Sequence, residues 1–138
     1  MRILGLDVGS KTIGVALSDA LKVTAQGLTT IYWTEHDMSS ADEKLQSIIE
    51  KNNVSEIVIG LPKHMNGSIG ERGELSKIYA NRLQKKFNLP VHLVDERLST
   101  VAAERALIEA DVSRKKRSKV IDKMAAVMIL QNFINQSS

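Results

Sequence analysis

The sequence predicts an α/β protein with a mixed central sheet and helices on both of its faces. Residues 2–19 form two apolar runs around a Gly-Ser-Lys turn, which is typical of a β-hairpin. A third extended run follows at 27–32, and strands then alternate with helices to the end of the chain. An antiparallel start followed by this alternation predicts a mixed sheet that is covered by helices on both sides.

The composition is that of an ordinary globular protein. A chain of 138 residues with 43% hydrophobic and 25% charged residues fits a single domain over residues 1–138. The sequence has no cysteine, which excludes disulfides and a thiolate zinc site. It has no long apolar run and no recognisable signal peptide, so we expect a soluble cytoplasmic protein without membrane association. With 4% aromatic residues, a surface that binds single strands mainly by stacking is not expected.

The expected elements after the hairpin follow from caps and periodicity. Ser39 or Ser40 is expected to cap a helix that runs to about Lys51. A glycine-rich polar stretch at 60–70 is expected to be a long loop. The other expected segments are a polar loop at 33–39, a buried strand at 56–60, a helix at 71–87 with Leu75, Ile78, Tyr79 and Leu83 on its apolar face, a strand at 91–95, a short helix at 100–110, a basic loop at 113–117 and a last helix at 118–135.

Asp7, near the end of the first strand, is the first candidate site residue. The strand is apolar on both faces and therefore reads as a central strand. A carboxylate at the end of a buried strand is costly unless a metal, a cation or hydrogen bonds compensate it. The alternative is that Asp7 only caps the turn by accepting bonds from the backbone of Gly9 or Ser10.

Two further carboxylates, Asp95 and Glu96, follow the last expected strand. Ligands in open α/β sheets bind outside the carboxyl ends of the strands, where Asp7 also lies. If the first and last strands are close in the sheet, these carboxylates converge, and their charges repel unless cations bind between them. The alternative is a solvated turn that pairs with Arg97.

Asp122 lies near the start of the apolar face of the last helix. It shares that face with Ala125, Ala126, Ile129 and Phe133, at spacings of three, four, seven and eleven residues. A lone acid at this place suits a metal ligand better than a core. The alternative is a favourable interaction with the positive end of the helix dipole.

Three carboxylates on two strand ends and a helix would form a site of oxygen ligands only. Such ligands select Mg²⁺ or Mn²⁺ rather than Zn²⁺. Two such ions can activate a water and stabilise the leaving oxygen in phosphodiester cleavage. His92, within a strand, is better explained as a packed histidine, and His64, in the long loop, is a weak candidate for a phosphate contact.

Positive charge stands close to these acids. The basic run 114–117, followed by Lys119, precedes the helix that carries Asp122 and could hold a phosphate backbone. The alternative is that this run is only a solvated loop. The further cations near expected strand ends are Lys11, Lys63, Arg72 and Arg97.

These stretches together resemble the motif set of the YqgF family, also called RuvX. The motifs are Asp7–Gly14, Gly60–Pro62, Asp95–Thr100 and Asp122–Ala126. They keep the family's order and extend over nearly the whole chain. The family has the RNase H-like fold, is related to the RuvC Holliday junction resolvases and is described as a pre-16S rRNA nuclease family.

The resemblance implies a hydrolase, a metal-dependent endonuclease that uses Mg²⁺ (or Mn²⁺) and processes the 5′ end of pre-16S rRNA. It implies Asp7, Glu96 and Asp122 as the catalytic and metal-binding set, and leaves open whether Asp95 is a ligand. The strand at 56–60 ends in Gly-Leu-Pro, without the carboxylate that many RNase H-like relatives carry there, so Glu96 would stand in from a different strand. The residues assigned to nucleic-acid binding are Lys11, Arg97, Arg114, Lys115, Lys116 and Arg117.

Three other interpretations stay open at this point. The protein could resolve branched DNA such as Holliday junctions, or bind nucleic acid without catalysis; either RNA or branched DNA would then be the partner, and a homodimer is compatible with both. The hairpin 7–19 also resembles the phosphate-binding hairpin of the actin-like ATPase and sugar kinase superfamily. Those proteins need two such domains to close over a nucleotide, and 138 residues supply one.

Overall fold

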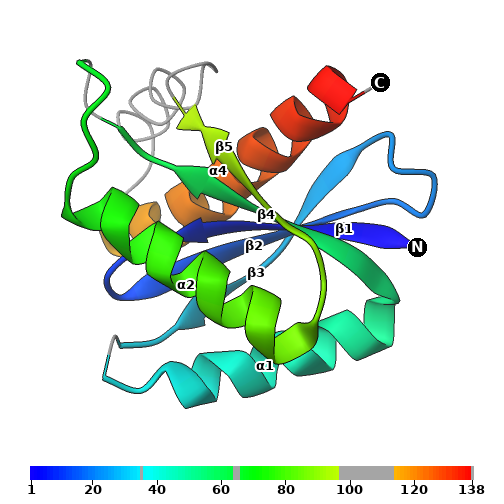
Figure 1. The fold of residues 1–138 in the computed structure, drawn as a ribbon, viewed down its shortest axis with the longest axis horizontal. Coiled ribbons are helices and arrows are strands. Elements are labelled where there is room, and N and C mark those ends of the chain that lie inside the picture. The colour runs from blue at the N-terminus through cyan, green and yellow to red at the C-terminus, as the bar shows by residue number, and fades with distance from the viewer. Residues whose placement is uncertain (35, 64–65, 97–113, 138) are drawn as a thin grey trace.

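The order of secondary structure agrees with the sequence prediction. The structure, a computed structural model, describes residues 1–34, 36–63, 66–96 and 114–137, with side chains in the last segment from Lys123 onward. The expected short helix at 100–110 lies outside these residues. The elements are β1 (Arg2–Val8), β2 (Thr12–Ser18), β3 (Ala25–Tyr32), α1 (Met38–Asn52), β4 (Val54–Leu61), α2 (Glu71–Phe87), β5 (Val91–Asp95) and α4 (Arg114–Ser137) (Figure 1).

The five strands form one mixed sheet in the order β3-β2-β1-β4-β5. β1 pairs antiparallel with β2, and β2 antiparallel with β3. β4 lies parallel to β1 on one side and to β5 on the other. The central position of β1, which is buried from Ile3 to Val8, is as predicted. The carboxyl ends of β1, β4 and β5 therefore lie at one edge of the sheet, which we call the carboxyl edge (Figure 1).

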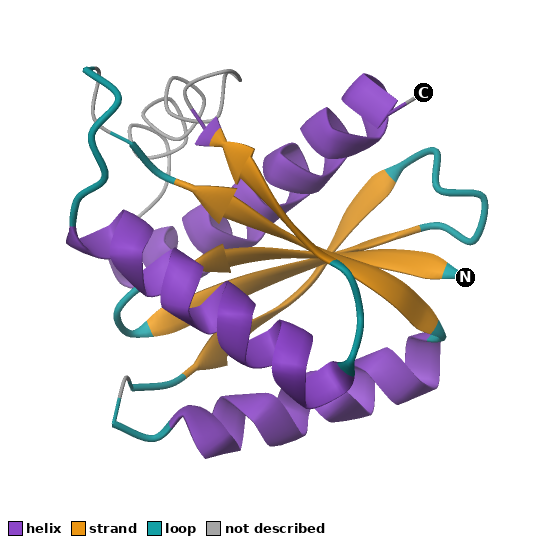
Figure 2. Ribbon diagram, in the orientation of Figure 1, coloured by secondary structure: helices purple, strands orange, loops and turns teal. Residues whose placement is uncertain are grey.

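Helices cover both faces of the sheet, as expected. α1 and α2 lie on one face and α4 crosses the other (Figure 2). Because side chains alternate along a strand, Leu4 and Leu6 of β1 pack toward α1 and α2, whereas Ile3 packs toward α4.

α4 approaches β1 very closely at Gly5. A Cβ atom at that position would lie 2.7 Å from the Cβ of Leu130 and 3.3 Å from the carbonyl oxygen of Ala126. Any side chain there would push the helix away from the sheet, so glycine on the strand and small residues on the helix set this spacing. Ala125 and Ala126 are buried, as the helical periodicity predicts.

The helix ends depart from the expected caps at one place. α1 begins at Met38, after Asp37, so Ser39 and Ser40 lie inside the helix and neither is its cap. Met38 packs against the core, and this contact draws the first turn one residue earlier than the serines. α1 ends at Asn52, close to the expected place, and its C-cap Asn53 has a left-handed φ of 53°, a conformation that asparagine tolerates.

Two residues near α2 do not behave as their surrounding sequence suggested. Trp33, expected in a polar loop, is buried, and its ring centroid lies 4.9 Å from that of Tyr79. Ile78, expected on the apolar face of α2, is 56% exposed. The buried apolar face of α2 is therefore narrower than the sequence periodicity indicated.

The prediction of a basic loop at 113–117 is also wrong. α4 already begins at Arg114, so the basic run forms its first turn. Arginine and lysine are good helix formers, and no glycine or proline separates this run from the rest of the helix. Among the described residues, no helix combines the length and the apolar character that crossing a membrane requires.

Candidate active site

Asp7 is a buried carboxylate at the carboxyl edge of the sheet. It pairs with Gly14 of β2 along the backbone, and its exposed fraction is 2%. Arg72, in the first turn of α2, donates from Nη2 to its Oδ1 over 2.9 Å. The Nε of Arg72 also donates to the carbonyl oxygen of Val8 over 3.3 Å. A cation thus offsets part of the cost of burying this charge.

Glu96, the residue that follows β5, is buried at the same edge, with 8% exposed. Gly60 of β4 lies between the two acidic strands, because Leu6 pairs with Ile59 and Gly60 pairs with Val94. A Cβ atom at Gly60 would lie 3.2 Å from Glu96 Oε1. The Glu96 carboxylate therefore lies over Gly60, beside the strand of Asp7. The alternative of a solvated turn is wrong for Glu96.

Asp95 has a different environment. Its Oδ2 lies 3.5 Å from Nζ of Lys63, which comes shortly after the end of β4. The partner that the solvated-turn alternative offered, Arg97, lies outside the described residues. Asp95 is thus part of a charge pair that joins the ends of β4 and β5.

The third proposed acid, Asp122, lies in α4 one helical turn before Ala126. Ala126 is the residue whose carbonyl contacts the Gly5 position, which places this part of the helix backbone next to β1. The side chains of Asp122 and of the basic run 114–117 fall outside the described part of the chain. Among the side chains that are described, no three His, Asp or Glu residues form a cluster that could hold a metal ion.

The two described acids nevertheless fit a divalent cation. Both offer carboxylate oxygens, the donors that Mg²⁺ and Mn²⁺ prefer. Gly60 does not itself offer an empty site, because a Cβ there would lie 2.4 Å from Cδ1 of Ile129 as well as 3.2 Å from Glu96 Oε1. Arg72 and Lys63 work in the opposite direction, because nearby positive charge disfavours a further cation.

The turn between β1 and β2 is fixed by Trp33. Its indole N–H donates to the carbonyl oxygen of Gly9 over 2.8 Å, and its backbone N–H donates to the carbonyl oxygen of Lys11 over 3.0 Å. Across the turn, Gly9 N–H donates to the carbonyl oxygen of Thr12 over 2.8 Å. Lys11 is exposed at this turn, beside the carboxyl edge.

Sequence reasoning missed these supporting contacts. It counted Arg72 and Lys63 only as cations near strand ends and gave neither a partner. It placed Trp33 in a polar loop. A tryptophan directly after a strand was the one available signal, because an aromatic ring of this size is usually buried to a large extent.

His92 is a packed residue, as the sequence suggested. Its Nε2 lies 3.0 Å from Oε2 of Glu56, and its ring stacks on Phe133 with centroids 5.0 Å apart. These contacts join β5, β4 and α4 and account for the histidine without a ligand.

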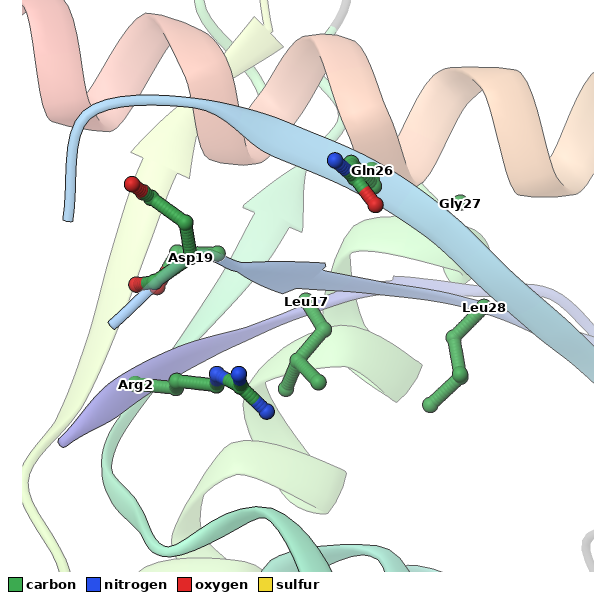
Figure 3. A pocket seen from close by; sticks show the side chains of 7 residues that line it. Arg2, Leu17, Asp19, Gln26, Gly27 and Leu28 are labelled. Atoms are coloured by element: carbon green, nitrogen blue, oxygen red, sulfur yellow. The ribbon is translucent and has the colours of Figure 1, made fainter. Parts of the chain in front are cut away.

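A surface hollow lies at the other end of the sheet (Figure 3). Its lining includes Arg2, Leu17, Asp19 and Leu28. Arg2 precedes Asp7 by five residues in β1, which corresponds to about 16 Å along a strand. The hollow is therefore separate from the acidic residues of the carboxyl edge.

Comparison with solved structures identifies the fold. RuvC of Thermus thermophilus in complex with a Holliday junction substrate superposes with a TM-score of 0.63 at 8% identity, covering 99% of this chain and 96% of that chain. Fowlpox virus resolvase, in complex with Holliday junction DNA, gives 0.50 at 11% identity and covers 99% of both chains. The fold is thus the RNase H-like fold of the resolvases.

The family follows from sequence comparison. The model of the RuvX family, described as a Holliday junction resolvase, matches residues 1–136, so the chain belongs to this family. A protein of Oceanobacillus iheyensis is 65% identical over 136 residues, which are 99% of both chains, and is named "Putative pre-16S rRNA nuclease". A Listeria monocytogenes protein with the same name is 56% identical over the full length of both. The resemblance seen in the motifs is confirmed.

One further solved structure matches only part of a larger chain. A ROK family protein of Streptococcus pneumoniae, in complex with sucrose, superposes with a TM-score of 0.50 at 21% identity. The match covers 78% of this chain but 38% of the other. It shows a shared fold over part of a larger protein and no more.

Proposed function

We propose that this protein is a metal-dependent endonuclease that cleaves phosphodiester bonds of structured RNA at the 5′ end of pre-16S rRNA. The observation that carries the proposal is that two buried carboxylates, Asp7 and Glu96, lie at the ends of the two strands that flank β4, at the carboxyl edge of an RNase H-like sheet. The name shared by relatives at 56–65% identity supports the substrate. We place the reaction in the cytoplasm, where ribosomal RNA precursors would be met.

In this proposal Asp7, Glu96 and Asp122 hold Mg²⁺ or Mn²⁺. When bound, the metal supplies Lewis-acid activation of a water and of the phosphodiester. The protein supplies rigid ligands: Asp7 lies on the central strand, and Glu96 lies over the side-chain-free Gly60. Burial of both carboxylates excludes bulk water and strengthens their interaction with any cation between them.

The nucleic acid is bound by cations around this edge. Lys11 stands exposed on the turn beside β1. The basic run Arg114–Arg117 forms the first turn of α4, the helix that carries Asp122. Arg97 follows directly after Glu96 in the sequence. Such contacts hold phosphates without regard to sequence, so the structure of the RNA would select the cleavage position.

The test is a cleavage assay on a pre-16S rRNA fragment that carries its 5′ extension, with and without Mg²⁺. We expect Mg²⁺-dependent cuts with the wild type and none with Asp7→Asn. Cleavage that persists in EDTA, or that survives in Asp7→Asn at the wild-type rate, would contradict the proposal. Binding of both proteins to the same RNA is measured in parallel, which separates a catalytic module from one that only binds.

A second candidate is resolution of Holliday junctions. It is favoured by the description of the RuvX family and by the likeness to RuvC in complex with a junction. A four-way junction needs two symmetric cuts, which a homodimer with two-fold symmetry would deliver. The same assay therefore includes a four-way DNA junction, and paired symmetric cuts at a rate above that on the RNA would favour this candidate.

A further inference from the structure

Arg72 contacts the carboxylate that we propose as a metal ligand. Nη2 lies 2.9 Å from Asp7 Oδ1, and Nε lies 3.3 Å from the carbonyl oxygen of Val8. The Arg72 side chain is 38% exposed, whereas that of Asp7 is 3% exposed. The guanidinium thus reaches from the surface to a buried acid, with one side on Asp7 and part of its group open to solvent.

This arrangement conflicts with metal binding at the same oxygen. An arginine side chain stays charged at any working pH. A divalent cation bound to Asp7 would stand within a few ångström of that charge, in surroundings that screen it poorly because Asp7 is buried. Without a cation, however, Asp7 requires a positive partner. Asp7 therefore needs one positive partner at a time: Arg72 in the metal-free protein and the metal ion in the loaded protein.

We propose that Arg72 and the divalent cation exchange at Asp7, and that the released guanidinium then binds a phosphate of the substrate. The inference rests on the proposed function in one respect, the binding of metal by Asp7. A guanidinium is a planar group with several donors and suits a phosphate. The position in the first turn of α2 favours an anion there as well. Arg72 is then both the counter-ion of the metal-free protein and a substrate contact of the loaded one.

Two neighbouring charge pairs provide matched controls. Lys63 lies at the same edge but pairs with Asp95 rather than Asp7. Arg82 also belongs to α2 but pairs with Asp42, a buried residue of α1. Removing Lys63 lowers the positive charge of the edge without freeing Asp7. Removing Arg82 disturbs α2 without touching the edge.

The first measurement is the affinity for Mn²⁺ in the absence of nucleic acid. Electron paramagnetic resonance distinguishes free from bound Mn²⁺ in this titration. Arg72→Gln is expected to bind Mn²⁺ about tenfold more tightly than the wild type, since a like charge is removed from the ligand. Lys63→Gln should bind more tightly by a smaller factor, and Arg82→Gln should match the wild type. Unchanged or weaker binding by Arg72→Gln would overturn the exchange.

The second measurement is the salt dependence of RNA binding, in EDTA and in Ca²⁺, with the RNA checked to be intact. If Arg72 binds a phosphate only after release, Arg72→Gln should flatten the salt dependence by about one unit of slope in Ca²⁺ and leave it unchanged in EDTA. Equal flattening in both conditions, or none in either, would overturn the phosphate contact.

Different results would contradict the proposed function and the exchange at Asp7. The proposed function is contradicted if the wild type binds no Mn²⁺, or if Asp7→Asn binds Mn²⁺ with the affinity of the wild type. A wild type that binds Mn²⁺ through Asp7, with Arg72→Gln of the same affinity, contradicts only the exchange.

Discussion

Two buried aspartates of this protein are each paired with an arginine from α2, yet the pairs differ in kind. Asp42, 1% exposed, receives both Nε and Nη2 of Arg82 on its Oδ2, at 2.9 and 2.5 Å. Tyr79 also donates to its Oδ1 over 3.4 Å. Asp7, equally buried, receives Nη2 of Arg72, whose Nε turns to the backbone of β1 instead.

The difference teaches that burial and pairing alone do not identify a functional acid. Asp42 joins two helices on one face of the sheet and is held by several donors. Asp7 lies at the carboxyl edge, on the strand next to Gly60, over which the Glu96 carboxylate lies. The first is a structural pair, and the second is one whose cation can be exchanged. The following predictions separate the two.

The largest effect is expected on cleavage. Asp7→Asn keeps the shape of the side chain but removes a charged ligand, so single-turnover cleavage of the rRNA precursor should fall by roughly a thousandfold, the scale of losing a major electrostatic stabiliser. Asp42→Asn, measured at a temperature where it is fully folded, should cleave at nearly the wild-type rate. Equal losses in the two variants would remove the distinction between the pairs.

Stability should show the reverse order. Arg82→Ala leaves the charge of Asp42, 1% exposed, without its main cation and should lower the free energy of unfolding by about 3–5 kcal/mol, the cost of leaving a buried charge uncompensated. Asp7→Asn should change it much less, because a neutral amide is easier to bury than a carboxylate and Arg72 can turn to water. Urea denaturation in EDTA measures both, and a larger loss for Asp7→Asn would contradict the structural role assigned to Asp42.

RNA binding should depend on the surface charge of the basic run in α4 and not on that of the helices α1 and α2, which hold the Asp42 pair. Replacing Arg114, Lys115, Lys116 and Arg117 with alanine should weaken binding to all RNA sequences alike and flatten its salt dependence by about one unit per lost contact, with cleavage at saturating RNA retained. The matched control replaces four exposed lysines of α1 and α2, Lys44, Lys51, Lys77 and Lys85. If both variants lose the same slope, the basic run is only part of the general charge.

The smallest effect concerns Tyr79 beside Asp42. Burial, and then the charge of Asp42, raise the pKa of Tyr79 above its ordinary value. The unfolded chain therefore releases this proton from about pH 10 while the folded protein retains it, so folding loses stability as the pH rises through that region, by up to about 1.4 kcal/mol per pH unit.

Tyr79→Phe should lack this loss and cost about 1 kcal/mol at neutral pH, for the hydrogen bond to Asp42. Denaturation curves of both proteins at pH 7, 9 and 10.5 measure the difference. Parallel pH dependence of the two would mean that Tyr79 ionises normally.

The sequence was enough to predict the strands, the main helices, and the position of Asp7 near the end of a central strand. Periodicity reports which side of an element is buried, and an antiparallel start followed by alternating strands and helices indicates a mixed sheet. The sequence could not show that Asp42 is buried whereas its neighbour Glu43 is exposed. The burial of Asp42 depends on its contact with Arg82, which lies forty residues away in the sequence. The Arg72–Asp7 pair was missed for the same reason, since it spans sixty-five residues.

Mapping the metal on the chain itself tests the central claim most directly. Fe²⁺ in place of Mg²⁺, with ascorbate and peroxide, generates hydroxyl radicals that cut the polypeptide near the bound ion. The cuts should fall close to Asp7, Gly60 and Glu96, disappear with excess Mg²⁺ and be absent in Asp7→Asn. Cuts that cluster at Asp42, or that remain unchanged in Asp7→Asn, would contradict the assignment of the carboxyl edge as the metal-binding active site.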